Sequence, residues 1–275
     1  MLNKFYIEEH VKNALKEDIS FEDITTDNLT GVNDKLNCTL NTREDGVCCG
    51  LDVFETVFRL LSEDVKIKFF VKDGDIIKKG DKLAEISGPA RAVLTGERTA
   101  LNYIQRMSGI ATTSRRYQDA ISEYNVRMVD TRKNTPNFRI FEKYAVKTGC
   151  GYVHRYNLSD CAMIKDNHVK FAGSITKAVE KLRKLISHAH KIEVECDTLE
   201  QVKEAVACNV DIIMLDNMSC DMMREAVKII DHKAIVEASG NVNMDTLKEI
   251  ASTGVDVISS SAIVAKAPTL DLGLD

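Results

Sequence analysis

The stretch KIEVECDTLEQVKEAVACNVDIIMLDN, residues 191–217, contains the unit on which the fold is built. The runs KIEVE and DIIML are short, apolar and rich in β-branched residues, which is typical of buried strands. The segment between them, TLEQVKEAVACN, has apolar residues at helical spacing and ends on an asparagine. A strand, a helix and a second strand in this order predict two parallel strands joined by a crossover helix.

The same alternation extends in both directions from this unit. Short apolar runs, each followed at once by polar or charged residues, recur through the second half of the chain. In order, they are VRMVD (126–130), GYV (151–153), CAMI (161–164), KIEVE (191–195), DIIML (211–215), AIVEA (234–238) and VDVI (255–258). Seven parallel strands at these spacings suit an incomplete α/β barrel better than an open sheet, and no G-x-G-x-x-G dinucleotide turn is present.

The first hundred residues have a different character. KLNCTLNTREDGVCCG (35–50) and VKIKFFVKDGDIIKKGDKLAEISGPA (65–90) are strand-like and contain Asp-Gly and Lys-Gly turns. A long helical stretch follows, which we expect to break near Gly109. We predict an N-terminal α/β sandwich-like domain over residues 1–112, to which the tail 267–275 could return, and an α/β barrel domain over residues 113–266.

Composition excludes several classes of protein. The chain has 275 residues, 44% of them hydrophobic, which is enough to bury a substantial core. No apolar run approaches the roughly 18 residues that span a bilayer, so we expect no membrane partner and a cytoplasmic protein. The eight cysteines form no C-x-x-C pair, which favours reduced thiols. A net charge of −5 without a long basic stripe argues against nucleic acid as a partner.

One segment carries the opposite charge. Residues 127–170 have a net charge of +5 within a chain whose total is −5. A concave cationic cluster in an acidic protein suits a small, highly charged anionic ligand, because it focuses the field at one point. In an α/β barrel the residues that follow the strands share one rim. The side chains expected to meet at that rim are Arg132, Lys133, His154, Arg155 and Lys165.

Two carboxylates reach the same rim. Glu195 and Asp216 each end an apolar strand, where a carboxylate is costly unless it is paired or bound to a metal. On spacing alone, they either neutralise the lysines of the cluster or hold Mg²⁺ together with substrate oxygens.

Small polar residues follow the last two strands. Ser239, Gly240 and Asn241 stand between a strand and a helix that we expect to begin near Asn243. Ser259–Ser261 follow the final strand. Free backbone N–H groups at such positions bind phosphate, and the loops after the last strands of a barrel are a frequent phosphate site. We therefore predict phosphate binding by these two loops, including Ser260 and Ser261.

Five segments together resemble quinolinate phosphoribosyltransferases, the carboxylating nicotinate-nucleotide pyrophosphorylases. They are GERTALNYIQRMSGIAT (96–112), VDTRKNTPNFRIFEKYAVKTGCGYVHRYNLSDCAMIKDNH (129–168), IEVECDTLEQ (192–201), DIIMLDNMS (211–219) and VEASGN (236–241). The resemblance covers nearly the whole chain. It implies an N-terminal α/β domain with an incomplete seven-stranded barrel. It also implies conversion of quinolinate and phosphoribosyl pyrophosphate (PRPP) to nicotinate mononucleotide, pyrophosphate and CO₂ in de novo NAD biosynthesis.

The resemblance also implies roles for individual residues. Quinolinate's carboxylates would be held by Arg132, His154, Arg155 and Lys165, together with Arg98 from a neighbouring subunit. Lys133 would lie near the pyrophosphate, and Glu195 and Asp216 would face the ribose hydroxyls and Mg²⁺. Ser239, Gly240 and Asn241 would hold the 5-phosphate. The resemblance therefore implies Mg²⁺ as cofactor and a homodimer with shared sites, with a higher assembly possible.

The chain departs from the family after its final strand. It reads SSSAIVAKAP (259–268), with Ser261 at a position usually held by glycine and Ala265 where a histidine usually stands. This departure leaves open an alternative, a molybdenum-transport-associated paralogue or an anion-binding relative without the activity. A second alternative is a Schiff-base aldolase that uses Lys133 or Lys165, although one active lysine does not require the arginines around it.

Overall fold

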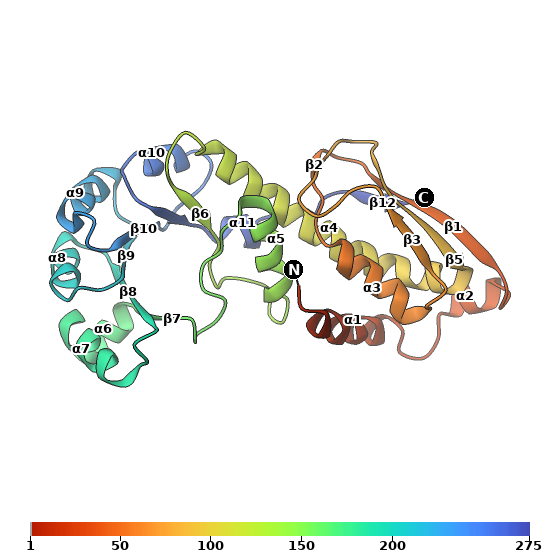
Figure 1. Ribbon diagram of the computed structural model, residues 1–275, viewed down its shortest axis with the longest axis horizontal. Helices are drawn as coiled ribbons and strands as arrows, with labels where there is room; N and C mark the ends of the chain where they lie inside the picture. Colours follow the sequence, from red (N-terminus) through yellow and green to blue (C-terminus); the bar gives the residue numbers. More distant parts are fainter. Residues whose placement is uncertain (1) are drawn as a thin grey trace. The chain divides into compact units, whose positions relative to one another are not determined.

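The computed structural model describes residues 2–275, which form two compact units. The first comprises the chain up to Arg115 together with Ile140–Gly149 and Ala267–Asp275. The second comprises Arg116–Arg139 and Cys150–Lys266 (Figure 1). Each unit has its own sheet, antiparallel in the first and parallel in the second.

The sheet of the first unit has four antiparallel strands with one buried face. Their order is β12 (Leu272–Leu274), β1 (Lys35–Thr42), β5 (Lys82–Pro89) and β3 (Lys66–Phe69), and a separate short pair joins β2 (Gly46–Val47) to β4 (Ile76–Ile77). Leu40 and Ile86 are buried, whereas Glu85 on β5 is exposed, as expected when one face of an antiparallel sheet meets solvent. The C-terminal strand β12 pairs with β1, with Leu274 opposite Leu40.

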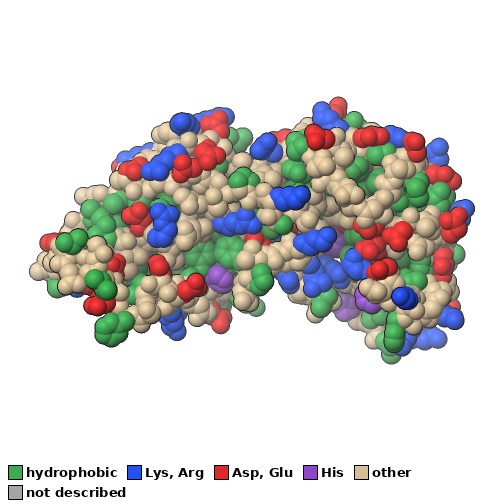
Figure 2. All heavy atoms as spheres, turned by 180° about the vertical axis from the view of Figure 1, so that it is seen from behind, with side chains coloured by type: hydrophobic (Ala, Val, Ile, Leu, Met, Phe, Trp, Pro, Cys, Tyr) green, Lys and Arg blue, Asp and Glu red, His purple; other side chains and the backbone are tan. Residues whose placement is uncertain are grey.

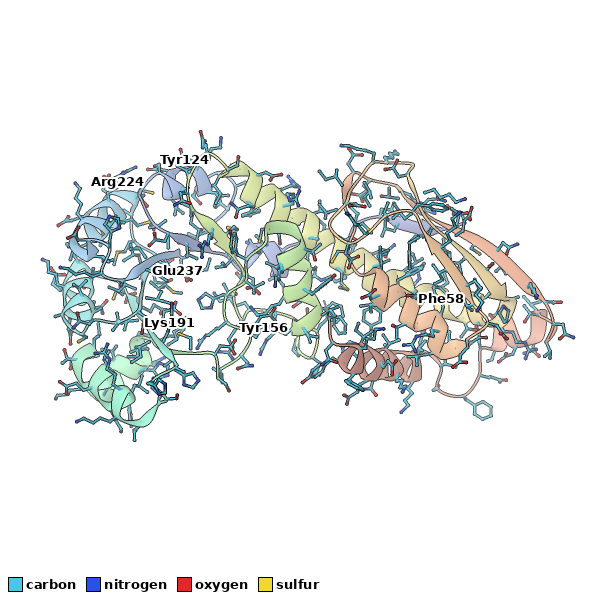
Figure 3. All side chains as sticks on the ribbon, in the orientation of Figure 1. Phe58, Tyr124, Tyr156, Lys191, Arg224 and Glu237 are labelled. Atoms are coloured by element: carbon cyan, nitrogen blue, oxygen red, sulfur yellow. The ribbon has the colours of Figure 1, made fainter. Side chains whose placement is uncertain are left out.

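Five helices accompany this sheet or lead away from it. They are α1 (Lys4–Asp18), α2 (Ile24–Leu29), α3 (Leu51–Leu61), α4 (Ala90–Ala120) and α5 (Arg139–Cys150). On α3 the apolar residues recur at helical spacing, and Phe54 and Phe58 are fully buried with their rings edge to face at 5.1 Å. Phe58 is labelled in Figure 3.

The helix α4 runs unbroken through Gly109, so the break predicted at that residue was wrong. A Cβ at Gly109 would lie 1.9 Å from the carbonyl oxygen of Pro268. The glycine therefore serves the close approach of the C-terminal segment to the helix, and the packing outweighs its low helix propensity of about 1 kcal/mol.

The second unit is built on a parallel sheet. In spatial order the strands are β6 (Arg127–Val129), β11 (Val257–Ser259), β10 (Ile235–Ser239), β9 (Ile212–Asp216), β8 (Lys191–Cys196) and β7 (Cys161–Ile164). The helices are α6 (Asp166–Ala172), α7 (Ile175–Leu185), α8 (Leu199–Ala207), α9 (Cys220–Ile230), α10 (Leu247–Ala251) and α11 (Ala262–Ala265). Figure 1 shows α6 to α9 along the outer side of this sheet. The predicted α/β organisation is confirmed.

The parallel sheet has six strands in place of the seven expected, because GYV (151–153) is not a strand. Gly151 has a φ of +85°, which ends α5 and turns the chain. The thiol of Cys150 donates to the carbonyl of Tyr152 at 3.4 Å, and the amide of His154 donates to Asp130 Oδ1 at 2.9 Å. The backbone groups of Tyr152 and His154 thus form hydrogen bonds with side chains, in place of the backbone hydrogen bonds that a neighbouring strand would provide. In the described chain, no strand pairing joins β6 to β7.

Across residues 2–275, the structure contains no helix that is both long enough and apolar enough to cross a membrane.

Candidate active site

A cavity of about 460 Å³ opens at the carboxyl ends of the parallel strands. Its lining residues are Thr131, Arg132, Lys133, His154, Arg155, Met163, Lys165, Glu195, Met214, Asp216, Glu237, Ser239 and Ser259. Each strand of the sheet supplies one or more of them, or leads directly into them. The parallel register sets Ser239 opposite Asp216 and Glu195 opposite Met214, so neighbouring strands end at the same rim.

Cations line one side of the cavity. Burial and the neighbouring charges of Arg155 and Arg139 lower the pKa of Arg132, so the arginines repel one another where no anion lies between them. The guanidinium of Arg155 donates to the carbonyl of Cys161 at 3.0 Å and to Met163 Sδ at 3.2 Å. Figure 2 shows Lys and Arg side chains gathered beside histidine in the lobe formed by the second unit. This side is built to receive negative charge.

Carboxylates line the opposite part of the rim. Glu195 forms an ion pair with Lys165. Asp216 accepts a hydrogen bond from the side-chain amide of Asn217 at 2.8 Å. Of the two alternatives for these carboxylates, pairing with a lysine of the cationic cluster is therefore observed for Glu195. The half-buried Asp216 keeps oxygen lone pairs with which it can bind another partner.

The loop after β10 is tied to the end of β9. The Asn217 amide donates to the carbonyl of Ser239 at 2.9 Å, and Asn241 Nδ2 donates to Asn217 Oδ1 at 3.1 Å. Gly240 has a φ of +92°, and a Cβ there would lie 2.2 Å from Asn217 Oδ1. Only glycine fits this position without displacing Asn217.

The helix after this loop begins later than expected. It starts at Leu247, and Asn243 Oδ1 instead accepts from the amides of Asp245 and Thr246 at 2.9 and 3.2 Å. The asparagine side chain thus organises a turn ahead of the helix, which explains the displacement.

At the end of β11, the serine that lines the cavity is Ser259, and not Ser260 or Ser261, the two predicted to bind phosphate. Ser260 is buried; its hydroxyl donates to the carbonyl of Val242 and accepts from the amide of Ala262, both at 3.2 Å. Ser261 precedes the four-residue helix α11, and neither serine lines the cavity. Ser259 does line it, and its buried hydroxyl has no hydrogen-bond partner among residues 2–275.

We use "floor" for the buried cluster of His154, Glu193 and Glu237, of which His154 and Glu237 line the cavity; the two glutamates were not predicted. His154 Nε2 lies 3.4 Å from Glu193 Oε2 and 3.3 Å from Glu237 Oε2, and both glutamates are buried. Glu237 is labelled on β10 in Figure 3. Burial raises the pKa of Glu193, and the two carboxylates raise the pKa of His154 against the opposing effect of burial, so the cluster as a whole holds protons more tightly than its separate members would. The available signal was a glutamate inside each of the apolar runs KIEVE and AIVEA, where both faces of a parallel strand are covered.

The cavity thus brings together most, but not all, of the predicted residues. Those present are Arg132, Lys133, His154, Arg155, Lys165, Glu195, Asp216 and Ser239. Gly240, Asn241, Ser260 and Ser261 lie outside its lining. Arg98 is exposed on α4, in the first unit. The lining residues that were not predicted are Thr131, Met163, Met214 and Glu237; Ser259 belongs to the loop predicted to bind phosphate, although it was not one of the residues singled out there.

Family models match almost the entire chain. The model of the quinolinate phosphoribosyl transferase N-terminal domain matches residues 23–108, and that of the C-terminal domain matches residues 110–275.

Individual relatives agree with these models. A probable nicotinate-nucleotide pyrophosphorylase [carboxylating] of Synechocystis is 44% identical, over 94% of this chain and 89% of that protein. A Bacillus subtilis protein of the same description is 38% identical, over 100% of this chain and 94% of its own length. Among solved structures, NadC from Streptococcus pyogenes is 40% identical with a TM-score of 0.97, covering 100% of this chain and 97% of the other. The nicotinate-nucleotide pyrophosphorylase of Francisella tularensis is 37% identical, with a TM-score of 0.96 and the same coverage.

Proposed function

The chain belongs to the quinolinate phosphoribosyltransferase family, and from this premise we propose how its cavity performs the reaction. The enzyme is a phosphoribosyltransferase of de novo NAD biosynthesis, which converts quinolinate and PRPP to nicotinate mononucleotide, pyrophosphate and CO₂. The observation that carries the proposed roles is one cavity with cations on one side and carboxylates on the other. Quinolinate is a dianion, and PRPP forms a cationic sugar as it reacts.

Quinolinate occupies the cationic side. Arg132, Arg155 and Lys165 receive its two carboxylates, and His154 lies at the floor of the same cavity. The arginines repel one another without an anion, so binding a dianion relieves that repulsion. Charge-assisted hydrogen bonds from guanidinium groups to carboxylates also fix the plane of the pyridine ring.

PRPP occupies the carboxylate side. Its ribose lies beside Glu195 and Asp216, its pyrophosphate near Lys133, and its 5-phosphate at the loop of Ser239, Gly240 and Asn241. This placement is supported by the rigid link between Asn217 and that loop, which holds backbone N–H groups in a fixed arrangement. Ser260 and Ser261 support the second phosphate loop through its backbone, because the Ser260 hydroxyl is already hydrogen-bonded within the protein.

The rim carboxylates fit Mg²⁺. Glu195 pairs with Met214 in the sheet, two residues from Asp216, so both carboxylates project at the same rim. One or two carboxylates with substrate oxygens and water form the usual Mg²⁺ environment. Bound there by Glu195 and Asp216, Mg²⁺ would neutralise charge on the pyrophosphate.

The chain's own residues act by position and charge. As the bond from the ribose C1 to the pyrophosphate breaks, positive charge develops on the sugar and is stabilised by Glu195 and Asp216. Lys133 stabilises the departing pyrophosphate. The quinolinate nitrogen forms the new bond to C1, after which the adjacent carboxylate leaves as CO₂. The electron pair of the broken bond stays on ring carbon 2, where the neighbouring cationic nitrogen stabilises it, and that carbon then takes a proton from water to give nicotinate mononucleotide. No protein nucleophile is needed, so holding the two substrates in line supplies much of the rate.

A second copy of the chain completes the site in this proposal. A groove of about 600 Å³ beside the cavity is lined by β7, α6 and α7. Phe171, Leu158 and Leu185 in its lining are 88%, 70% and 74% exposed, and apolar side chains exposed side by side are typical of surfaces that bind another protein. We propose a homodimer that covers this groove and brings Arg98 of the partner copy to the quinolinate. All eight cysteines are free thiols, which fits a reducing compartment such as the cytoplasm.

The test is direct turnover. Purified protein is given quinolinate, PRPP and Mg²⁺, and nicotinate mononucleotide is followed by absorbance, with nicotinic acid replacing quinolinate in a parallel cuvette. We expect product from quinolinate alone. A folded protein that binds PRPP but makes no product from either acid would contradict the proposal and favour an anion-binding relative.

A further inference from the structure

Both ring nitrogens of His154 already face protein groups. Nδ1 accepts a hydrogen bond from the backbone amide of Arg155 at 2.7 Å. Nε2 points to the carboxylates of Glu193 and Glu237 at 3.4 and 3.3 Å. An imidazole whose Nδ1 accepts a hydrogen bond carries its proton on Nε2. That proton therefore lies between the two glutamates.

This arrangement argues against a metal ion at the same cluster. The atoms of His154, Glu193 and Glu237 lie within 4.8 Å of one another, close enough to surround an ion. A metal on Nε2 would move the proton of the neutral imidazole to Nδ1, where it would point at the amide N–H of Arg155 that Nδ1 accepts in this structure. A proton shared by the three groups satisfies all of these contacts, and the raised proton affinity of the cluster belongs to them jointly.

Burial of the two glutamates is energetically unfavourable and calls for an explanation. Glu193 is fully buried, and neither of its oxygens has a hydrogen bond among the described residues beyond the ion-pair contact of Oε2 with His154. Burying a carboxylate with so few partners costs several kcal/mol relative to an apolar side chain of similar size. A purely structural core would be more stable without it.

The cluster fixes the chain next to it. His154 donates its backbone amide to Asp130 Oδ1 at 2.9 Å and accepts the amide of Arg155 through Nδ1. The Arg155 guanidinium is then held by the carbonyl of Cys161 and by Met163 Sδ. Residues 152–155 have no regular secondary structure, so these side-chain contacts are what position Arg155 in the cavity.

We propose that Glu193 and Glu237 are positioning residues for the transfer reaction: they hold His154 through Nε2, and His154 in turn fixes Arg155 on the side of the cavity that binds quinolinate. The inference rests on the proposed function. It gives His154 a role that acts through Arg155, in addition to its place in the cavity lining.

The test separates quinolinate binding from PRPP binding. Glu237→Gln keeps the shape of the side chain and removes its charge. We expect KM for quinolinate to rise roughly tenfold, as for loss of one charge-assisted hydrogen bond, and KM for PRPP to change less than about twofold. Glu193→Gln should act in the same direction. Glu204→Gln is the matched control, because Glu204 accepts from Thr176 N and Oγ, both at 2.8 Å, outside the cavity lining; it should leave both KM values unchanged.

A double-mutant cycle tests whether the glutamates act through the histidine. If they do, His154→Gln combined with Glu237→Gln should be no worse than His154→Gln alone. Additive losses would overturn the proposal. So would a lower melting temperature in both Glu→Gln variants with unchanged KM for quinolinate, which would assign a structural role only. Stoichiometric zinc or manganese in the purified protein that is lost in Glu193→Gln would also overturn it.

A wild-type protein that makes no nicotinate mononucleotide would contradict the proposed function instead. The positioning role would then be tested by calorimetric titration of the same variants with quinolinate, where unchanged affinity in Glu237→Gln and Glu193→Gln would overturn it.

Discussion

The rim and the floor of the cavity use the same residue type in opposite ways. Glu193 and Glu195 both lie on β8, two residues apart, and therefore project from the same side of the strand. Glu195, at the rim, is paired with Lys165, whose side chain is 43% exposed. Glu193, at the floor, is fully buried beside His154.

The difference shows how depth along one strand sets the role of a carboxylate. At the rim, solvent and substrate can replace Lys165 as the partner of Glu195, so its interaction can change during the reaction. At the floor such exchange is restricted, because the His154 side chain is only 12% exposed and both glutamates are buried. We therefore expect rim substitutions to change the chemical step or ligand affinity directly, and floor substitutions to act through the residues they hold.

The largest effect is expected from Glu195→Gln at the rim. Loss of the negative charge beside the ribose should lower kcat by roughly 100-fold, as for other groups that stabilise transition-state charge. KM for quinolinate should change little. Steady-state kinetics with each substrate varied in turn measures both. If kcat fell no further than in Glu237→Gln, rim and floor carboxylates would not differ as argued.

Lys165→Ala should have the next largest effect, on affinity. Removal of a cation that meets a quinolinate carboxylate should weaken quinolinate binding roughly 30-fold, and PRPP binding clearly less. Isothermal titration with each ligand gives the comparison, with Lys191→Ala as control for loss of a lysine outside the cavity lining. Equal losses for both ligands would remove the assignment of Lys165 to quinolinate.

The rim, unlike the floor, is proposed to be completed by a second copy. Arg98→Ala and Lys165→Ala proteins should each be weakly active alone. After mixing and subunit exchange, about half the dimers are hybrids with one intact site, so activity should recover to about a quarter of wild type. A mixture of Glu237→Gln with Lys165→Ala serves as the control. Both of these residues come from the same chain of each site, so a hybrid dimer contains no intact site and activity should not recover on mixing. Absence of recovery in the first mixture would argue against shared sites.

The last prediction concerns the folding stability of the rim loop after β10 in place of its kinetics. Gly240→Ala adds a Cβ 2.2 Å from Asn217 Oδ1 at a φ of +92° and should lower the free energy of unfolding by about 3 kcal/mol. Gly80→Ala is the matched control, with a φ of +93° and no atom within 4 Å of the added Cβ, and should cost about 1 kcal/mol. Urea unfolding measures both. Equal losses would show that the contact with Asn217 does not constrain the loop.

Much of the architecture could be predicted because its signals are local. Strand and helix periods appear within each segment, and a cation directly after an apolar run must lie at the carboxyl end of that strand. Arg132, Arg155 and Lys165 accordingly line one cavity, as the spacing indicated. Their roles in catalysis stay predictions until the kinetics above are measured.

The predictions that went wrong or fell short depended on distant neighbours. GYV has strand composition, but Gly151 turns the chain. Gly109 has the composition of a helix break, but it lies where Pro268 packs against the helix. Ser260 and Ser261 were predicted to bind phosphate; only their neighbour Ser259 lines the cavity, and phosphate binding by this loop stays a prediction.

The sequence by itself determined the alternation of strands and helices, the family, and the order in which charged residues follow the strands, because each is written in neighbouring residues. Only the tertiary structure decided which carboxylates lie at the rim and which at the floor, and that His154 joins Glu193 to Glu237. The physical reason is that burial and ion pairing depend on which side chains from strands far apart in the sequence meet in the same low-dielectric interior. The distances between those side chains cannot be predicted from the pattern of neighbouring residues.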